Sequence, residues 1–143
     1  MTVKQLSVFL ENKCGRLAEV TRVLGENGIN IRAFSIADTT DFGVLRLIVN
    51  RPQDAYDALK KEGFTVSLTD VIAVQIPDRP GGLADVLALI QDAGVNIEYL
   101  YAFVGKVSQD ALAVFRLENP RVAIKLLEEK GLKLLSEEEV YNL

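Results

Sequence analysis

The chain has 143 residues, of which 49% are hydrophobic and 25% charged, a composition typical of a folded globular protein. Its net charge of −4 argues against binding to a phosphate backbone, so we expect no nucleic acid partner. Histidine is absent and Cys14 is the only cysteine, which excludes an intrachain disulfide, a zinc cluster and a triad with an imidazole base. No apolar run is long enough to span a bilayer and the N-terminus lacks a signal-peptide pattern, so we expect a cytoplasmic protein without a membrane partner.

In chain order, the first half of the sequence predicts strand, helix, strand, strand, helix, strand. The strands are short apolar runs rich in β-branched residues, and they end at turn-forming residues. Apolar residues three and four positions apart indicate the first helix, and a proline opens the second, where its missing N–H does no harm. The expected strands are 5–11, 28–38, 44–49 and 65–70, and the expected helices stop at Gly28 and Gly63.

The second half of the sequence repeats the first. The matching pairs are Gly15 and Gly81, Gly28 and Gly94, Asn30 and Asn96 at a spacing of 66 residues, then Pro52 and Pro120, Gly63 and Gly131 at a spacing of 68. The two additional residues fall in the central loop of the second copy, around residues 105–109. A repeat of this length predicts two units, residues 1–69 and 70–143, that bury their faces on each other.

The second copy therefore predicts the same order of elements. Its expected strands are 71–77, 94–104, 111–117 and 133–137. Ser136 and Glu139 have the spacing of a capping box, which indicates a last helical turn at the end of the chain. The order strand, helix, strand, strand, helix, strand, found twice, predicts an α+β fold of two ferredoxin-like βαββαβ units, each a four-stranded antiparallel sheet with two helices on one face.

A glycine turn precedes the first helix of each copy. The N-terminus of a helix presents unpaired N–H groups and the positive end of the helix dipole, and glycine lets an anion approach the backbone closely. Gly15 and Gly81 stand at these positions. A single glycine turn is a weak motif, and the alternative is that each glycine merely redirects the chain from strand to helix.

The residues around these turns favour a ligand site. The segments NKCGRL and DRPGGL each carry a side-chain oxygen three residues before the first glycine, and each helix is followed by GINI or GVNI. With these motifs the sequence resembles the ACT family of small ligand-binding modules, whose pattern is a strand, then N-x-P-G-x-L, a helix and G-[IV]-N-I. The resemblance covers essentially the whole chain, once per copy, as in small tandem ACT proteins.

The resemblance implies that an amino acid or a similar effector binds at the interface between two ACT units. Backbone N–H groups of each turn would bind the ligand carboxylate, an oxygen of Asn12 or Asp78 would accept from its ammonium group, and an asparagine of the facing unit would complete the site. Such a pairing of donors and acceptors suits a zwitterion. The expected ligand-binding residues are Asn12, Cys14, Gly15, Arg16, Leu17, Asn30, Asp78, Pro80, Gly81, Gly82, Leu83, Asn96, Tyr99 and Tyr101.

The two copies depart from the family pattern in different ways. Cys14 stands where the pattern has proline, and Asp78 stands where it has asparagine, so the two pockets are not equivalent. Tyr99 and Tyr101 are two residues apart on an expected strand, so their rings share one face. They either fill the interface between units or form an aromatic wall beside an amino acid.

The sequence is therefore interpreted as a regulatory amino-acid sensor with no catalytic activity, no cofactor and no metal. We expect an amino-acid effector, a homodimer, and an enzyme of amino-acid metabolism as a further partner. The alternative is a protein–protein assembly module whose turns bind nothing, or a regulatory subunit of a metabolic enzyme. A small phosphatase that uses an arginine beside the turns is disfavoured, because no suitable general base accompanies Arg16 or Arg79.

Overall fold

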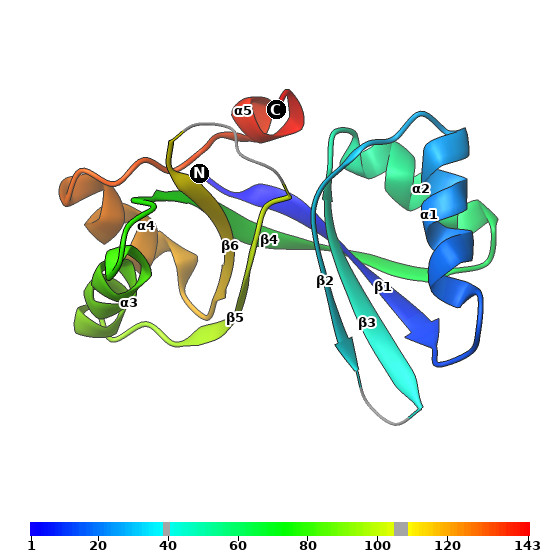
Figure 1. Ribbon diagram of the computed structural model, residues 1–143, viewed down its shortest axis with the longest axis horizontal. Coiled ribbons are helices and arrows are strands. Elements are labelled where there is room, and N and C mark those ends of the chain that lie inside the picture. Colours follow the sequence, from blue (N-terminus) through cyan, green and yellow to red (C-terminus); the bar gives the residue numbers. More distant parts are fainter. Residues whose placement is uncertain (39–40, 105–108) are drawn as a thin grey trace. The chain divides into compact units, whose positions relative to one another are not determined.

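The computed structural model describes residues 1–38, 41–104 and 109–143. The elements follow the expected order, in which two consecutive strands stand between the two helices of each repeat, as in the ferredoxin-like pattern (Figure 1). They are β1 (Val3–Glu11), α1 (Arg16–Glu26), β2 (Ile31–Asp38), β3 (Phe42–Val49), α2 (Pro52–Lys61), β4 (Thr65–Ile76), α3 (Gly82–Asp92), β5 (Ile97–Ala102), β6 (Ala111–Leu117), α4 (Pro120–Glu129) and α5 (Glu137–Tyr141). The α+β fold of two βαββαβ repeats is confirmed. The expected insertion around residues 105–109 falls largely outside the described residues.

Contacts divide the chain into two compact units. The N-terminal unit is Lys4–Thr69 with Asn142, and the C-terminal unit is Asp70–Tyr141 with Met1–Val3 and Leu143. Hydrogen bonds connect the strands in the order β2-β3-β1-β4 in the first and β4-β6-β5 in the second. The strand β4 thus contributes to both units.

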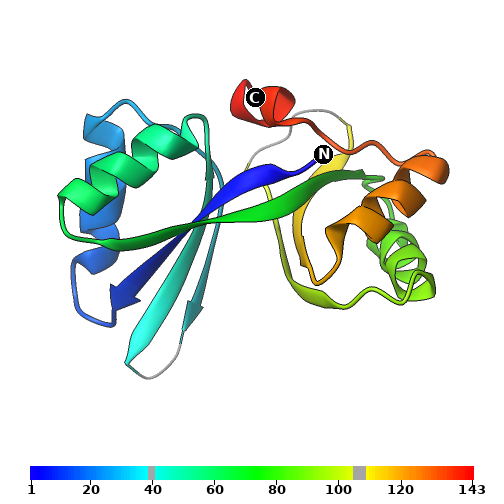
Figure 2. The same cartoon turned by 180° about the vertical axis from the view of Figure 1, so that it is seen from behind.

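In the N-terminal unit, alternate residues of β1 form the core with the helices. Val8 lies opposite Leu45 of β3, and both side chains are buried. Together with the buried stripe of α1, which includes Val20 and Leu24, they form one apolar cluster. The helices α1 and α2 contact each other on the same side of the sheet, as Figures 1 and 2 show from opposite directions.

The C-terminal unit repeats this packing with its own core. Val74 of β4 lies opposite Ala113 of β6, and Ile72 lies opposite the fully buried Phe115. Helices α3 and α4 pack against this cluster through their apolar stripes, the first of which includes Ile90. Each unit therefore buries its helices on its own sheet, which positions the turn before each first helix.

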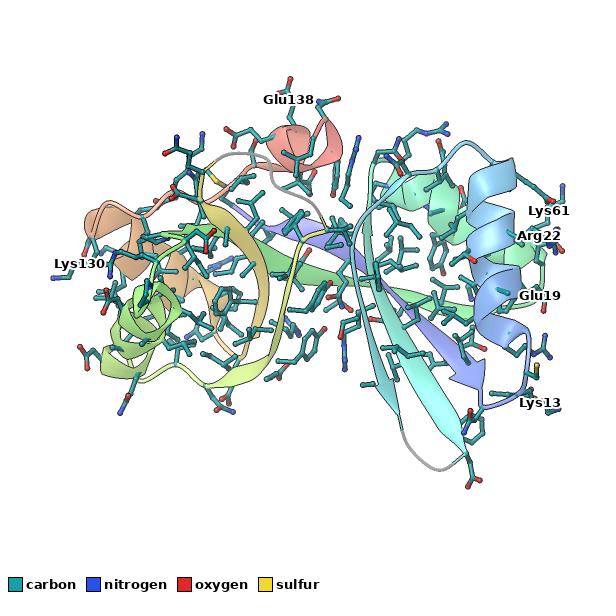
Figure 3. The ribbon with its side chains drawn as sticks, in the orientation of Figure 1. Lys13, Glu19, Arg22, Lys61, Lys130 and Glu138 are labelled. Atoms are coloured by element: carbon teal, nitrogen blue, oxygen red, sulfur yellow. The ribbon has the colours of Figure 1, made fainter. Side chains whose placement is uncertain are left out.

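The outer faces of the helices are charged. Figure 3 shows Arg22 and Lys61 pointing away from the sheet of the N-terminal unit. Arg22 pairs with Glu26 at 2.9 Å, four residues farther along α1, and both side chains are mostly exposed. Such exposed pairs contribute little to stability, because water and salt screen the two charges, so the apolar stripe rather than this face holds the helix in place. Every helix in the described ranges is too short or too polar to cross a lipid bilayer.

The expected strands 28–38 and 94–104 are shorter in the structure, where they span Ile31–Asp38 and Ile97–Ala102, and further strand predictions differ more. The expected strands 65–70 and 71–77 form the single strand β4, because no glycine or proline interrupts the chain between them. The expected strand 133–137 is reduced to one bridge, between Leu134 and Val74. The chain turns away immediately afterwards because Ser136 caps α5.

The predicted capping box at the C-terminus is confirmed. The backbone N–H of Ser136 donates to Oε2 of Glu139 at 2.8 Å, and the N–H of Glu139 donates to Oγ of Ser136 at 3.2 Å. Lys133 also lies 2.9 Å from Oε1 of Glu139. The hydrogen bond from Ser136, with the contribution of Lys133, lowers the pKa of Glu139 below its ordinary value.

Protonation of Glu139 should loosen α5. Because the folded-state pKa is lowered, the carboxylate stabilises α5 above the unfolded glutamate pKa of about 4.3, and this contribution is lost as the pH falls through the lowered value. We expect the hydrogen-exchange protection of the Val140 amide, which donates to the carbonyl of Ser136, to fall in that range. Glu139→Gln should remove this dependence while keeping an acceptor for Ser136, and Glu137→Gln should keep it. Equal pH profiles for the two variants would contradict the assignment.

Candidate functional site

The turn before α1 has the geometry expected of a helix start without a side-chain cap. Gly15 adopts the left-handed conformation, with φ of +88°, and as a glycine it provides no side-chain cap for the helix. The first intrahelical bond runs from the N–H of Glu19 to the carbonyl of Gly15, at 2.9 Å. The N–H groups of Leu17 and Ala18 precede this bond and have no partner in the preceding turn of helix, so an acceptor outside the helix must satisfy them.

The turn before α3 reproduces this backbone. Gly81 has φ of +84°, and the N–H of Asp85 donates to its carbonyl at 2.9 Å. The N–H of Gly82 donates to the carbonyl of Arg79 at 2.9 Å, where the first turn has a bond from Arg16 to Lys13 at 3.3 Å. The repeat seen in the sequence is therefore also a repeat of hydrogen bonds.

The two turns differ at the first residue of each helix. Gly82 is buried, and a Cβ atom placed on it would overlap the carbonyl oxygen of Pro77. The first copy has Arg16 at the corresponding position, half-exposed and paired with Glu19 at 3.2 Å. The second turn thus requires glycine at its second position, whereas the first carries a long cationic side chain there.

Three of the predicted ligand-binding residues line one cavity of the C-terminal unit. Asp78, Leu83 and Tyr101 contribute to this cavity of about 210 Å³, which we call the Asp78 cavity. Leu100 and residues 111–113 complete its walls. The walls of the cavity are mostly apolar. Asp78 contributes an anionic side chain, and Arg79, which also lines the cavity, contributes a cationic one.

The aromatic prediction on β5 is confirmed in its geometry. The rings of Tyr99 and Tyr101 stack with centroids 6.4 Å apart and planes inclined by 19°, so the two residues share one face of the strand. Tyr101 is 8% exposed and lines the Asp78 cavity. Tyr101 therefore forms a buried aromatic wall of the cavity, in contact with a second ring.

The N-terminal unit places its predicted residues in two adjoining cavities, which share Glu11 and Phe42 as wall residues. Asn12 lines a cavity of about 340 Å³ beside Asp41. Arg16 lines another, of about 180 Å³, which we call the Arg16 cavity. Its walls include Phe9, Leu10, Glu11, Phe42, Glu62 and Phe64. The turn of the first copy therefore does not gather its predicted residues as the second turn does.

The predicted asparagines lie away from the turns of their own units. Asn96 lines a cavity with Leu87 and Gln91 at the C-terminal end of α3, whereas Asp78 precedes the N-terminal end of that 11-residue helix. A helix of that length spans about 16 Å. The backbone N–H of Asn30 donates to Oδ1 of Asn50 at 2.9 Å. Their expected role, to complete the site of a facing unit, stays a prediction.

The remaining predicted residues belong to the turns but do not line these cavities. They are Cys14, Gly15, Leu17, Pro80, Gly81 and Gly82. Sequence reasoning missed the contributions of Arg79, Leu100 and β6 to the Asp78 cavity. The sequence shows Arg79 beside the turn. The β6 residues reach the cavity through the pairing of strands, for which the sequence carries no local signal.

Among the described residues, no three Cys, Asp or Glu side chains are grouped so that they could hold a metal ion.

Comparison with known proteins assigns the chain to a family of regulatory modules. The family model for an ACT domain pair matches residues 1–143. The crystal structure of protein BT0572 from Bacteroides thetaiotaomicron is 47% identical, with 100% of this chain and 98% of that chain covered and a TM-score of 0.94. No curated protein sequence shows significant similarity.

Two solved structures with known roles share the fold at lower identity. The ligand-free regulatory subunit of aspartate kinase from Thermus thermophilus is 18% identical, with 88% of this chain and 91% of that chain covered and a TM-score of 0.64. The regulatory subunit from Thermus flavus is 19% identical, with coverage of 88% and 90% and a TM-score of 0.61. At these identities the likeness establishes the fold alone.

Substitution of Gly82 tests the close approach in the second turn. Gly82→Ala should lower the free energy of unfolding by roughly 1–3 kcal/mol, because the new methyl group overlaps a backbone carbonyl that cannot move without breaking the turn. Gly25→Ala is the matched control: Gly25 lies within α1 with open space around it, so alanine should stabilise the protein by roughly 0.5–1 kcal/mol. Denaturant unfolding measures both, and a neutral Gly82→Ala would contradict the close contact.

Proposed function

Because the chain belongs to the family of ACT domain pairs, we propose that it is a regulatory protein that binds an amino acid and has no catalytic activity of its own. Its two ACT units are assigned to residues 1–69 and 70–143. The ligand is proposed to bind where the glycine turn of one ACT unit faces a second unit. A cytoplasmic location and a homodimer are part of the same proposal.

The observation that supports this function most strongly is the composition of the Asp78 cavity. Its volume of about 210 Å³ is below the roughly 300–1,000 Å³ of pockets for drug-sized ligands, which suits a metabolite as small as an amino acid. The carboxylate of Asp78 would accept hydrogen bonds from the ligand ammonium group. The apolar walls, including Leu83 and Tyr101, would surround its side chain.

The carboxylate of the ligand would bind at the start of α3. The N–H groups of Leu83 and Ala84 precede the first intrahelical bond, which Asp85 donates, and the positive end of the helix dipole lies there. Arg79 adds a positive charge, although it is also paired with Asp85 at 2.8 Å. We propose the C-terminal turn as the principal site. The C-terminal turn contributes several predicted residues to one cavity, whereas the predicted residues of the N-terminal turn lie in different cavities.

Regulation would follow from linkage between binding and the arrangement of the units. A ligand that contacts two units stabilises one arrangement over others, and a partner protein that distinguishes these arrangements responds. The energy available is the difference in affinity for the two states, typically about 1–3 kcal/mol. The fold shared with regulatory subunits of aspartate kinase favours an enzyme of amino-acid metabolism as that partner.

An assembly module without a ligand is the second candidate. The edge strand β2 exposes Phe34 and Ile36, at 54% and 49%, and the edge strand β5 exposes Leu100. Exposed apolar residues on an edge strand favour pairing with another sheet. The two functions are compatible in one protein, but only the sensor requires the turns to bind a ligand.

Thermal unfolding of the full chain in the presence of each of the twenty amino acids tests the sensor function. An amino acid at 100 times its dissociation constant should stabilise the folded protein by about 2.7 kcal/mol. Asp78→Ala should remove this stabilisation, because no side-chain oxygen is left to accept from the ammonium group. Asp92→Ala, at the exposed far end of α3, should retain it. If no amino acid raises the unfolding temperature, the assembly module becomes the better account.

A further inference from the structure

The end of α1 carries an asparagine followed directly by a glycine. Asn27 ends the helix, and Gly28 follows it with φ of +68°. An asparagine side chain reacts most readily with the next backbone nitrogen when that residue is glycine, because no Cβ atom hinders the approach. Both residues are exposed, so water reaches them. Each of the other asparagines in the sequence precedes a residue with a side chain: Asn12, Asn30, Asn50, Asn96, Asn119 and Asn142.

The reaction of this pair is deamidation, which needs only water and a solvent base. The backbone nitrogen of Gly28 loses its proton and attacks Cγ of Asn27, the new C–N bond closes a five-membered succinimide ring, and Nδ2 leaves as ammonia. Water then opens the ring at one of its two carbonyl carbons. Opening at Cγ leaves aspartate, whereas opening at the backbone carbonyl carbon leaves isoaspartate, whose main chain runs through Cβ.

The folded backbone opposes ring closure. Asn27 has ψ of 10°, so the nitrogen of Gly28 nearly eclipses the nitrogen of Asn27 and is turned away from the Cβ atom that carries Cγ. The N–H of Gly28 donates to the carbonyl of Gly25 at 3.1 Å, and Nδ2 of Asn27 donates to the carbonyl of Val23 at 2.8 Å. Deamidation therefore requires a local opening in which ψ of Asn27 rotates and these hydrogen bonds break.

Arg51, at the start of α2, holds the peptide that must rotate. Its Nη2 donates to the carbonyl of Asn27 at 2.8 Å and to the carbonyl of Gly28 at 3.0 Å. Nη1 of the same guanidinium donates to Oδ2 of Asp54 at 3.3 Å, which fixes the other side of the group. Rotation of ψ moves the carbonyl of Asn27 away from Arg51, so the opening must also break these charge-assisted hydrogen bonds.

The internal repeat separates this arrangement from the requirements of the fold. Ala93 and Gly94 correspond to the asparagine and the glycine, and Asn119 corresponds to Arg51. A Cβ atom placed on Gly28 would lie 3.2 Å from Nη2 of Arg51, whereas one placed on Gly94 would meet no atom within 4 Å. The C-terminal unit makes the same helix end without a reactive amide and without a guanidinium over it. The reactive pair and the arginine that holds it therefore occur together in one unit and are both missing from the other.

We propose that Asn27 is a site of spontaneous deamidation, and that Arg51 sets its rate by holding the Asn27–Gly28 peptide in the closed conformation. The site lies at the opposite end of α1 from the glycine turn and requires no ligand. It is independent of the function proposed above.

Deamidation would loosen the end of α1 permanently. A carboxylate at position 27 cannot donate to the carbonyl of Val23, and it adds a negative charge at the negative end of the helix dipole. Isoaspartate also lengthens the backbone by one atom, which displaces Ile29, a core residue whose N–H donates to the carbonyl of Leu24 at 2.9 Å. Chains that contain isoaspartate should therefore lose hydrogen-exchange protection at the Ile29 amide, and full protection there would overturn this consequence.

Incubation of the full chain in mildly alkaline buffer tests the site. Mass spectrometry of the peptide that contains Asn27 follows the mass increase that accompanies replacement of the amide NH₂ by OH. The folded wild-type chain should react more slowly than the chain in denaturant, and Arg51→Gln should react roughly fivefold or more faster than the folded wild type, since two charge-assisted hydrogen bonds are lost. Asn27→Gln should abolish the mass increase, because its longer side chain would have to close a six-membered ring.

Two matched variants separate the role of Arg51 from other causes. Arg22→Gln removes the same charge from α1, where Arg22 pairs with Glu26, and Gly82→Ala destabilises the C-terminal unit without touching the site. Both should react at the wild-type rate. An equal increase in either variant, or no increase with Arg51→Gln, would overturn the role of Arg51. Absence of deamidation at Asn27 in the folded wild-type chain and in folded Arg51→Gln would overturn the site itself.

Discussion

The left-handed glycine before each first helix is the constraint on which the geometry of both turns depends. A residue with φ near +85° lets the chain leave the strand and enter the helix within a few residues, and side chains disfavour that conformation. It also leaves the first helical N–H groups without a side-chain cap. The same backbone feature therefore completes the fold and starts the helix with N–H groups whose acceptor must come from outside the helix.

The repeat preserves this backbone while the side chains around it have diverged. In the C-terminal unit, glycine at position 82 brings the helix against Pro77, and Asp78, Leu83 and Tyr101 share one cavity. In the N-terminal unit, Arg16 extends from the same position into a cavity with aromatic walls. A duplicated unit that keeps its fold through buried apolar stripes is free to change the residues at the ends of its sheet, which is where the two units differ.

The sequence predicted the elements well because each has a local signal: apolar spacing for the helices, prolines at their starts and glycines at their ends. The capping box at Ser136 is local in the same sense. The continuity of β4 follows from the absence of glycine and proline between its two halves, whereas the loss of strand 133–137 depends on pairing with distant residues, which no local pattern records. For the same reason the sequence identified Asp78 and Tyr101 as candidates but could not indicate that β6 completes their cavity, nor that Phe9 and Phe42 lie beside Arg16.

Backbone amide shifts test the proposed binding of an amino-acid carboxylate by the turn before α3. The full chain, labelled with ¹⁵N, would be titrated with the amino acid that most raises its unfolding temperature. We expect the amide resonances of Leu83 and Ala84 to move most and to saturate together with that of Asp78. Saturating binding that leaves these three amides unmoved would contradict it.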